Sequence, residues 1–179
     1  MIKLLVITGI IFFSIQLTYA QDYNQKLINN QNGEEILIGL CTRSVFQEKN
    51  YKEWYDEEYR YYIWSKNIHL LDSIKAKPDS LTILVVLGSW CEDSRKQFPR
   101  FMGLLDYIGF KDKNLKIICV DRTKKVIIGN IDSLKITLVP TFIFYHGKQE
   151  IGRIVESPVE SLEADMYKII RWRKDIDRK

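Results

Sequence analysis

The chain has 179 residues, of which 46% are hydrophobic and 28% are charged. This is the composition of a globular protein with a core, and it excludes a low-complexity or collagen-like chain. The formal net charge is +4, yet acidic and basic side chains alternate, as in residues 111–113 and 173–175. Such alternation indicates a mixed, solvated surface and argues against a basic stripe that would bind nucleic acid.

The first residues have the layout of a secretory signal peptide, predicted to span residues 1–20. Lys3 gives a positive start, residues 4–17 are almost wholly apolar, and residues 18–20 place small side chains before a cleavage point. An uncleaved membrane anchor is the alternative, because a run of about 20 apolar residues can span a bilayer. Polar residues within the run favour cleavage. We therefore expect an exported protein, periplasmic and without stable membrane insertion after cleavage.

Residues 21–77 are predicted to form an N-terminal extension that is mainly helical. Residues 34–40 are apolar enough for a short strand, and Thr42 or Ser44 can then cap a long helix that ends before Pro78. Aromatic residues recur along this helix at helical spacing, with charges off their face. A stripe that faces the core explains them better than a docking surface for a partner.

Residues 78–179 are predicted to form the main domain. The run Leu81–Leu87 is continuously apolar and rich in β-branched residues, which is typical of a strand buried on both faces. A helical pattern follows over residues 92–108, and residues 115–120 form a second apolar run. Because a helix separates these two strands, we expect them to be parallel neighbours.

The remainder of the chain predicts a hairpin and a final helix. Residues 131–136 suit a short helix or turn, and residues 141–145 and 150–155 flank a His-Gly-Lys turn. Ser157 then provides a helix cap, followed by a proline and a capping-box glutamate, for a helix that runs to about Trp172. The predicted class is therefore α/β with a mixed sheet.

Three sequence markers carry a resemblance to a known family. Trp90 and Cys91 lie where the first buried strand turns into a helix, Pro99 lies inside that helix, and residues 139–141 (Val-Pro-Thr) precede the hairpin. In this spacing and element order, residues 81–172 resemble the thioredoxin family. The form Trp-Cys-Glu-Asp-Ser further resembles an exported bacterial branch with a Trp-Cys-x-Asp-Ser motif (CxxS).

The resemblance implies a thioredoxin fold, which is a central mixed β-sheet flanked by helices, here with an N-terminal helical extension. It also implies a substrate site formed by Trp90 and by a loop of Val139, Pro140 and Thr141, with a cis peptide bond before Pro140. The Val139 backbone would then face an incoming polypeptide and pair with it like a strand. The expected partners are exported proteins that contain cysteine, or small thiols, and no cofactor is expected.

Cys91 is predicted to be the nucleophile. It lies at the start of a helix, where unpaired backbone N–H groups and the macrodipole favour an anion. The thiolate is the form of cysteine that attacks disulfides. The Ser94 hydroxyl is expected to donate a hydrogen bond to the sulfur, whereas Glu92 and Asp93 oppose a second negative charge. Cys91 and Ser94 are therefore the expected catalytic residues.

The sequence departs from the family at three linked positions. Ser94 replaces the second cysteine, Val85 replaces a buried aspartate, and Ile117 replaces the lysine partner of that aspartate. A mixed disulfide on Cys91 would have no neighbouring thiol to resolve it. Because these losses argue against dithiol reduction, monothiol chemistry remains: isomerisation of disulfides, removal of small thiols such as glutathione, or covalent capture of a partner.

Two further cysteines are candidate resolving groups. Cys119 ends a strand expected to neighbour the one before Cys91, and Cys41 lies between a short predicted strand and a helix cap. Their commoner role is that of small buried hydrophobic residues. An odd number of cysteines leaves at least one thiol free or paired outside the chain. His69 and His146 are too few and too scattered for a metal site, so no metal is expected.

Two functions follow from these features. The leading interpretation is an exported thiol–disulfide exchange protein that uses Cys91 as its only nucleophile. The alternative is a redox-inactive binding or chaperone module of the thioredoxin fold, which would hold extended chains at residues 139–141. Retention of Trp90, Cys91 and Pro140 favours exchange, whereas Ser94 in place of cysteine favours binding. A fold alone does not decide between them.

Overall fold

A mixed β-sheet forms the centre of the protein. The computed structural model describes residues 22–28, 33–62, 68–75, 81–127 and 129–176. Across the sheet the strand order is β1-β2-β4-β3-β5-β6. The strands in chain order are β1 (Gln25–Ile28), β2 (Glu35–Cys41), β3 (Leu81–Leu87), β4 (Leu115–Cys119), β5 (Thr141–His146) and β6 (Gln149–Val155). The helices are α1 (Lys49–Tyr62), α2 (Glu92–Tyr107) and α3 (Leu162–Ile176), with short 3-10 helices that include η1 (Arg43–Gln47) and η2 (Ile68–Ile74).

Strand β3 lies inside the sheet with the bounds predicted from its apolar run. It pairs in parallel with β4, where Val85 faces Ile117, and antiparallel with β5, where Val86 faces Thr141. The parallel crossover through α2 and the antiparallel hairpin of β5 and β6 confirm the predicted order of elements. As a result, the carboxyl end of β3 lies beside the start of β5.

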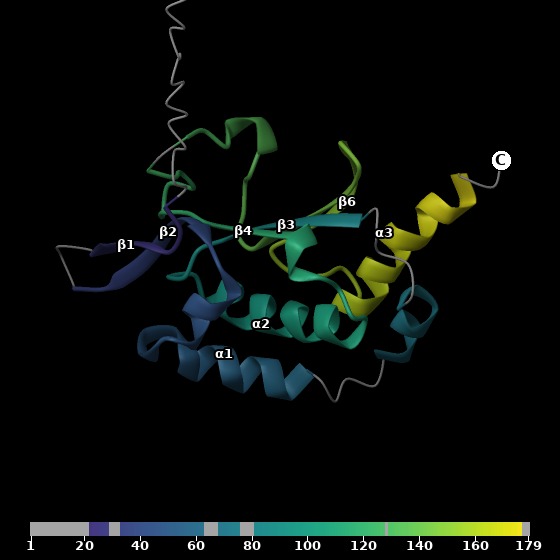
Figure 1. Cartoon of the computed structure of the whole chain (residues 1–179), viewed down its shortest axis with the longest axis horizontal. Coiled ribbons are helices and arrows are strands. Elements are labelled where there is room, and N and C mark those ends of the chain that lie inside the picture. Colours follow the sequence, from purple (N-terminus) through teal and green to yellow (C-terminus); the bar gives the residue numbers. More distant parts are fainter. Residues whose placement is uncertain (1–21, 29–32, 63–67, 76–80, 128, 177–179) are drawn as a thin grey trace, which may run out of the picture.

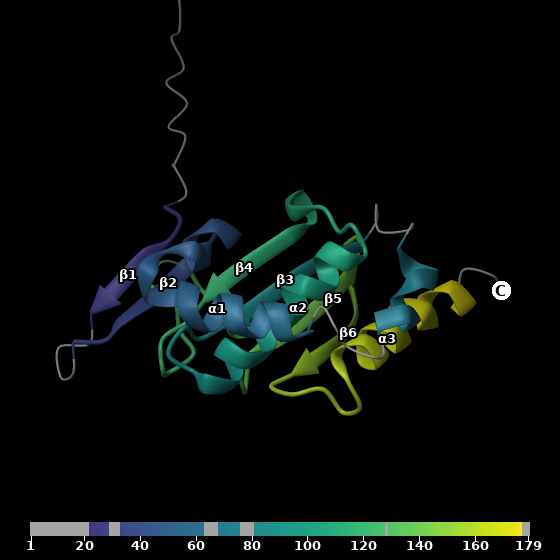
Figure 2. The same ribbon diagram turned by 90° about the horizontal axis from the view of Figure 1, so that it is seen from below.

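The two faces of the sheet are covered differently. Helix α2 lies directly below the sheet in Figure 1, with α1 beneath α2. Figure 2 looks at the molecule from below and shows both helices lying over this face of the sheet. The larger core cluster lies here, with Phe101 packed on Phe142 at a ring-centroid distance of 4.3 Å. On the opposite face a smaller cluster around Val86 is covered by side chains of the segment before β5, including Val126 and Ile131.

The N-terminal extension contains more strand than predicted. Strands β1 and β2 form an antiparallel hairpin, and β2 adds to the edge of β4, where Leu40 faces Ile118. The helix expected from Thr42 or Ser44 is divided into η1 and α1. Thr42 makes no side-chain cap and instead receives a hydrogen bond from the Asn24 amide at 3.0 Å. The strand forms because the edge of β4 offers unpaired backbone groups, and pairing there buries the apolar side chains of β2.

Parts of the N-terminal prediction lie outside the described residues. These parts are the signal peptide at residues 1–20, the boundary at residues 77–78 and the far end of the expected long helix. Among the helices that the structure does describe, none is long and apolar enough to cross a membrane.

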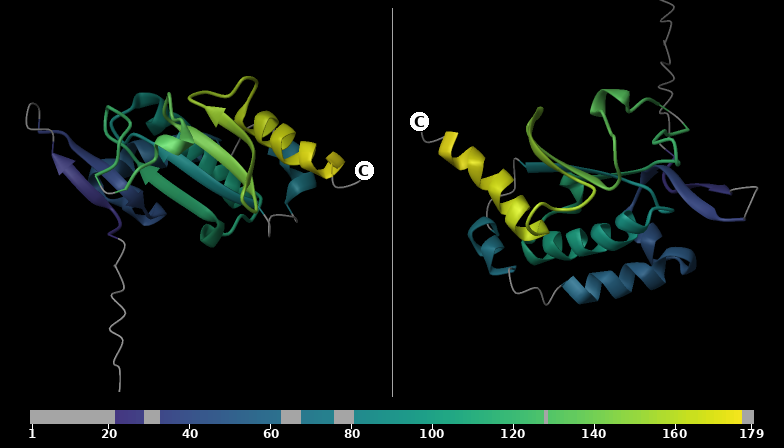
Figure 3. Two further views of the ribbon diagram at one scale, coloured as in Figure 1. Left: turned by 90° about the horizontal axis from the view of Figure 1, so that it is seen from above. Right: turned by 180° about the vertical axis from the view of Figure 1, so that it is seen from behind.

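Helix α3 begins later than predicted. The expected cap was Ser157, but the helix starts at Leu162, and the Ser161 hydroxyl oxygen accepts the Ala164 N–H at 3.1 Å as the cap. Leu162 and Met166 are completely buried, so the start of the helix follows from the side chains that reach the core. Figure 3 shows α3 next to β6, against which it packs.

Phe46 links the N-terminal extension to the core and provides a test of this packing. Its side chain is completely buried, and its ring centroid lies 4.6 Å from that of Phe98 and 6.0 Å from that of Tyr55. Phe46→Ala is expected to lower the free energy of unfolding by about 3–4 kcal/mol, because it removes a buried ring and leaves a cavity. Urea unfolding followed by circular dichroism measures this loss.

The matched control is Val159→Ala, since Val159 is 96% exposed. This substitution should change the free energy of unfolding by less than about 0.5 kcal/mol. A change of similarly small size in Phe46→Ala would contradict the integration of the extension into the core.

Candidate functional site

Cys91 lies at the junction between β3 and α2. It is the N-cap residue of α2, with an extended backbone at φ −91° and ψ 128°. The turn that leads to it is closed by a hydrogen bond from the Cys91 N–H to the Gly88 carbonyl oxygen at 2.9 Å. Cys91 is partly exposed, whereas the other two cysteines are buried.

The sulfur faces the loop that precedes β5. The Cys91 S–H donates to the Val139 carbonyl oxygen at 3.4 Å, and the Val139–Pro140 peptide bond is cis, which confirms that prediction. Thr141 is buried, and its hydroxyl donates to the Leu138 carbonyl oxygen at 2.7 Å. These contacts bring the predicted nucleophile and the predicted substrate loop together.

Trp90 is fixed beside Cys91 by contacts on several sides. Its indole N–H donates to the Val120 carbonyl oxygen at 2.8 Å. Its ring lies so close to Gly88 that a Cβ at that position would be 2.6 Å from a ring carbon. The Arg122 guanidinium lies over the ring, 4.9 Å from its centroid, in a cation–π arrangement. Glycine at position 88 is therefore required by the approach of the indole.

Ser94 makes a different hydrogen bond from the one expected with the sulfur. Its side chain is completely buried, and its hydroxyl oxygen accepts the Gly88 N–H at 3.2 Å, which ties the first turn of α2 to the end of β3. Ser89 acts in a similar way, since its hydroxyl oxygen accepts the Leu37 N–H of β2 at 2.9 Å. The two serines therefore position the turn that carries Cys91.

A network of charges beside Trp90 was not predicted from the sequence. Glu34 accepts hydrogen bonds from Arg122 at 2.8 Å and from Arg95 at 3.3 Å. Arg95 also donates through Nε to the Ser89 carbonyl oxygen at 2.6 Å. No local sequence pattern indicates this network, because Glu34 lies just before β2, far along the chain from both arginines.

The two other cysteines belong to a different part of the core. Cys41 and Cys119 lie in the larger cluster, on the face covered by α2, whereas Cys91 packs against the smaller cluster on the opposite face. Cys119 is completely buried, and burial raises the pKa of its thiol. The structure does not bring either of these candidate resolving groups to the Cys91 sulfur.

The positions at which the family resemblance implies an aspartate and a lysine are direct neighbours. Val85 in β3 faces Ile117 in β4 across the parallel pair, and both side chains are buried. An apolar pair of side chains thus occupies these two positions. No ionisable group at these two positions can assist proton transfer near position 94.

The other polar candidates have structural partners. The Asp121 carboxylate accepts backbone N–H groups of Thr123 and Lys125 at 2.8 and 2.9 Å, so it caps a turn. His69 lies 3.4 Å from the Asp72 carboxylate. Within the described ranges, no group of three or more His, Cys, Asp or Glu side chains could hold a metal ion.

The geometry of Cys91, Trp90 and the loop before β5 is the basis for any assignment of function. Protein-family models, curated proteins and solved structures give no match to this chain. The function is therefore inferred from the partly exposed thiol, the backbone that faces it and the side chains that hold both.

Gly88→Ala tests the close packing of Trp90. A methyl group at this position would overlap the indole ring, so we expect Trp90 to move and the free energy of unfolding to fall by about 1–3 kcal/mol. Urea unfolding measures the fall. The control is the same substitution in a Trp90→Ala background, where its additional cost should be below about 0.5 kcal/mol. Strictly additive effects of the two substitutions would contradict the contact.

Proposed function

We propose that this chain is an exported thioredoxin-like thiol–disulfide exchange protein with Cys91 as its single nucleophile. The observation that carries the proposal is the position of the Cys91 sulfur, which is partly exposed, at the first turn of α2, and 3.4 Å from the Val139 carbonyl oxygen. A sulfur in this position meets a substrate disulfide beside a backbone segment that can hold the substrate.

A thioredoxin fold is part of the proposal. In its support, β3, α2 and β4 make a parallel crossover, β5 and β6 make an antiparallel hairpin, and α3 follows. Pro99 inside α2 and the cis bond before Pro140 occupy the positions that the family resemblance implies. Strands β1 and β2 and helix α1 would then be additions to that fold.

The first chemical step is attack of the Cys91 thiolate on one sulfur of a substrate disulfide. A new S–S bond joins Cys91 to the substrate, and the other substrate sulfur leaves as a thiolate that takes up a proton. Because Ser94 stands where a second thiol would be, this intermediate persists until another thiol attacks it. If that thiol belongs to the substrate, the net reaction is isomerisation. If it is glutathione attacking a bound glutathionyl group, the net reaction is deglutathionylation.

The loop before β5 offers a place for the substrate backbone. In the resting protein the Val139 carbonyl oxygen accepts the Cys91 S–H. When Cys91 loses its proton or enters a mixed disulfide, this oxygen is released and can accept an N–H from an extended substrate. Leu138 is 43% exposed beside it and provides an apolar contact. Substrate binding is thereby coupled to the chemical state of the sulfur.

Removal of the Cys91 thiol is the direct test of this proposal. Wild-type protein should react rapidly with a disulfide-bonded peptide that carries a fluorogenic reporter, and Cys91→Ser should slow the reaction by at least about 100-fold, because the other cysteines are too deeply buried to meet the disulfide of a peptide. The matched control, Cys41→Ser, should keep the fast phase. Equal rates in wild type and Cys91→Ser would mean that Cys91 is not the working group.

A redox-inactive binding or chaperone module is the second candidate. The apolar pair of Val85 and Ile117 favours it, since neither residue supports a resolving thiol. Trapping of mixed disulfides in the native compartment separates the candidates. Partners released by reductant and absent from Cys91→Ser support exchange, whereas partners that this variant retains support binding alone.

Ser94→Cys tests the consequence of the missing second thiol. A thiol at this position could attack the mixed disulfide on Cys91, so the steady amount of covalent adduct with a disulfide-bonded peptide should fall by about tenfold or more. Non-reducing electrophoresis measures the adduct. The matched control is Lys96→Cys, at an exposed position of α2, which should leave the adduct intact. An unchanged adduct in Ser94→Cys would contradict the monothiol mechanism.

A further inference from the structure

Cys41 and Cys119 meet across two neighbouring strands, away from the site described above. In the antiparallel pair of β2 and β4, Cys119 faces Gly39 and Cys41 faces Ile117. Side chains two residues apart on a strand lie on the same face, so the two cysteines are diagonal neighbours in the larger core cluster. Gly39 has no side chain that would separate them.

The two thiols are buried in the same core cluster. Cys41 is 5% exposed and Cys119 is completely enclosed. The Cys41 S–H donates to the Gly39 carbonyl oxygen at 3.7 Å, and burial together with the neighbouring Cys41 thiol raises the pKa of the Cys119 thiol. Since a disulfide requires a sulfur separation of about 2.05 Å, the two sulfurs would have to move closer together than in this structure, in which both cysteines are free.

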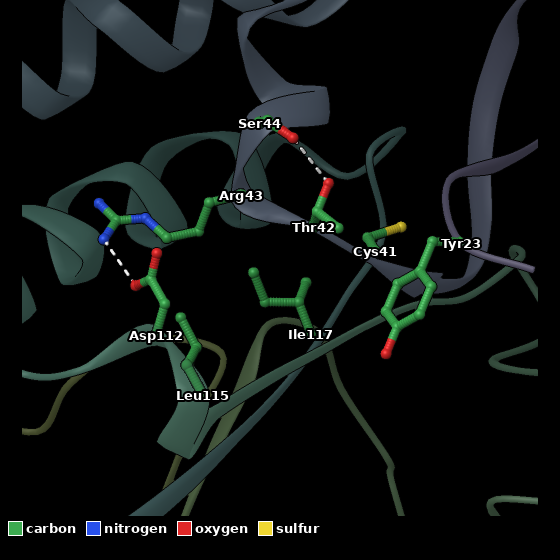
Figure 4. A pocket seen from close by; sticks show the side chains of 8 residues that line it. All are labelled: Tyr23, Cys41, Thr42, Arg43, Ser44, Asp112, Leu115 and Ile117. Atoms are coloured by element: carbon green, nitrogen blue, oxygen red, sulfur yellow. Dashed lines mark hydrogen bonds and ion pairs between the residues drawn. The ribbon is translucent and has the colours of Figure 1, made fainter. Parts of the chain in front are cut away.

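Cys41 can be reached from the surface through a pocket of about 410 Å³ beside β2. Figure 4 shows Cys41 on the wall of this pocket, with its sulfur directed toward Tyr23. On the other side lies the ion pair of Arg43 and Asp112 at 3.1 Å. A pocket of this size admits a small molecule, and the 5% exposure of Cys41 disfavours access by the disulfide of a folded protein.

We propose that Cys41 and Cys119 form a second redox couple, in which a low-molecular-weight disulfide such as oxidised glutathione enters this pocket and closes a disulfide between β2 and β4. Cys41 is the point of entry because it lines the pocket, and Cys119 then completes the bond from within the core. The couple is independent of the chemistry proposed for Cys91.

The exchange proceeds in two steps. Cys41 gives up its proton and attacks the small disulfide, so that one half becomes joined to Cys41 and the other half leaves and is protonated to a thiol. Cys119 then gives up its proton and attacks the Cys41 sulfur, which expels the second half as a thiol. Two protein thiols become one disulfide, and one small disulfide becomes two thiols. Burial raises the pKa of the Cys119 thiol, which lowers the fraction of Cys119 that is present as the attacking thiolate.

The disulfide would fasten the N-terminal hairpin to the rest of the sheet. Strand β2 pairs with β4 only through Gly39, Leu40 and Cys41. The disulfide would therefore hold together two strands that share only a few backbone hydrogen bonds. The loop that it closes contains α1, β3 and α2, and a long closed loop gives a large stabilisation by restricting the unfolded chain.

Cys91→Ser protein isolates this couple from the active-site thiol. After incubation with oxidised glutathione, denaturation and alkylation, we expect the mass to be lower by about 2 Da, the two lost hydrogens, with no alkylated cysteine. The matched control, Cys91→Ser with Cys119→Ala, should instead carry glutathione on Cys41. Two alkylated cysteines in Cys91→Ser, or a glutathione retained on its Cys41, would overturn the proposal.

The melting temperature provides a second readout. Oxidised Cys91→Ser should melt about 10 °C above its reduced form, and reductant should reverse the shift. The same oxidant should not raise the melting temperature of the control that also lacks Cys119. An oxidised protein that melts no higher than the reduced one would overturn the role of the bond in fastening the hairpin. Because all these proteins lack Cys91, either failure leaves the proposed exchange function untouched.

Discussion

The pairing of β5 with β3 determines the geometry of the candidate site. In this antiparallel pair the last residues of β3 face the first residues of β5, so the turn that leaves β3 lies beside the loop that enters β5. The packing of Phe101 on Phe142 holds α2 against β5 at the same time. The contact between the Cys91 sulfur and the Val139 carbonyl oxygen follows from both constraints, because Cys91 lies at the N-cap position of α2 and Val139 lies just before β5.

The elements of the main domain could be predicted because each has a strong local signal. The unbroken run Leu81–Leu87 predicts its own bounds. The cis bond before Pro140, which the structure contains, was expected only from the family resemblance. The signal for Glu35–Cys41 is equally local, but its partner is the edge of β4, far along the chain. The sequence therefore predicts that this segment is a short strand, but it does not predict that the strand pairs with β4. The start of α3 at Leu162 likewise depends on burial, which overrides an apparently good cap at Ser157.

The contacts around the candidate site were only partly predicted from the sequence. The Ser94 hydroxyl was expected to donate a hydrogen bond to the Cys91 sulfur, whereas its oxygen accepts the Gly88 N–H. The ion pairs of Glu34 could not be predicted, since they join residues that only the sheet brings together. Through Glu34 and the hydrogen bond to Ser89, the N-terminal hairpin supports the turn that carries the thiol. The extension is therefore part of the structure on which the site depends.

The protein thus contains an accessible single thiol and a separate buried pair of thiols. The central claim is that only Cys91 attacks the disulfide of a polypeptide. The most direct measurement is a single-turnover reaction of the wild-type protein with a disulfide-bonded peptide, quenched with acid and mapped by mass spectrometry. We predict that the peptide is attached to Cys91 while Cys41 and Cys119 remain unmodified. Attachment of the peptide to either of these cysteines, or the absence of any covalent product, would contradict the claim.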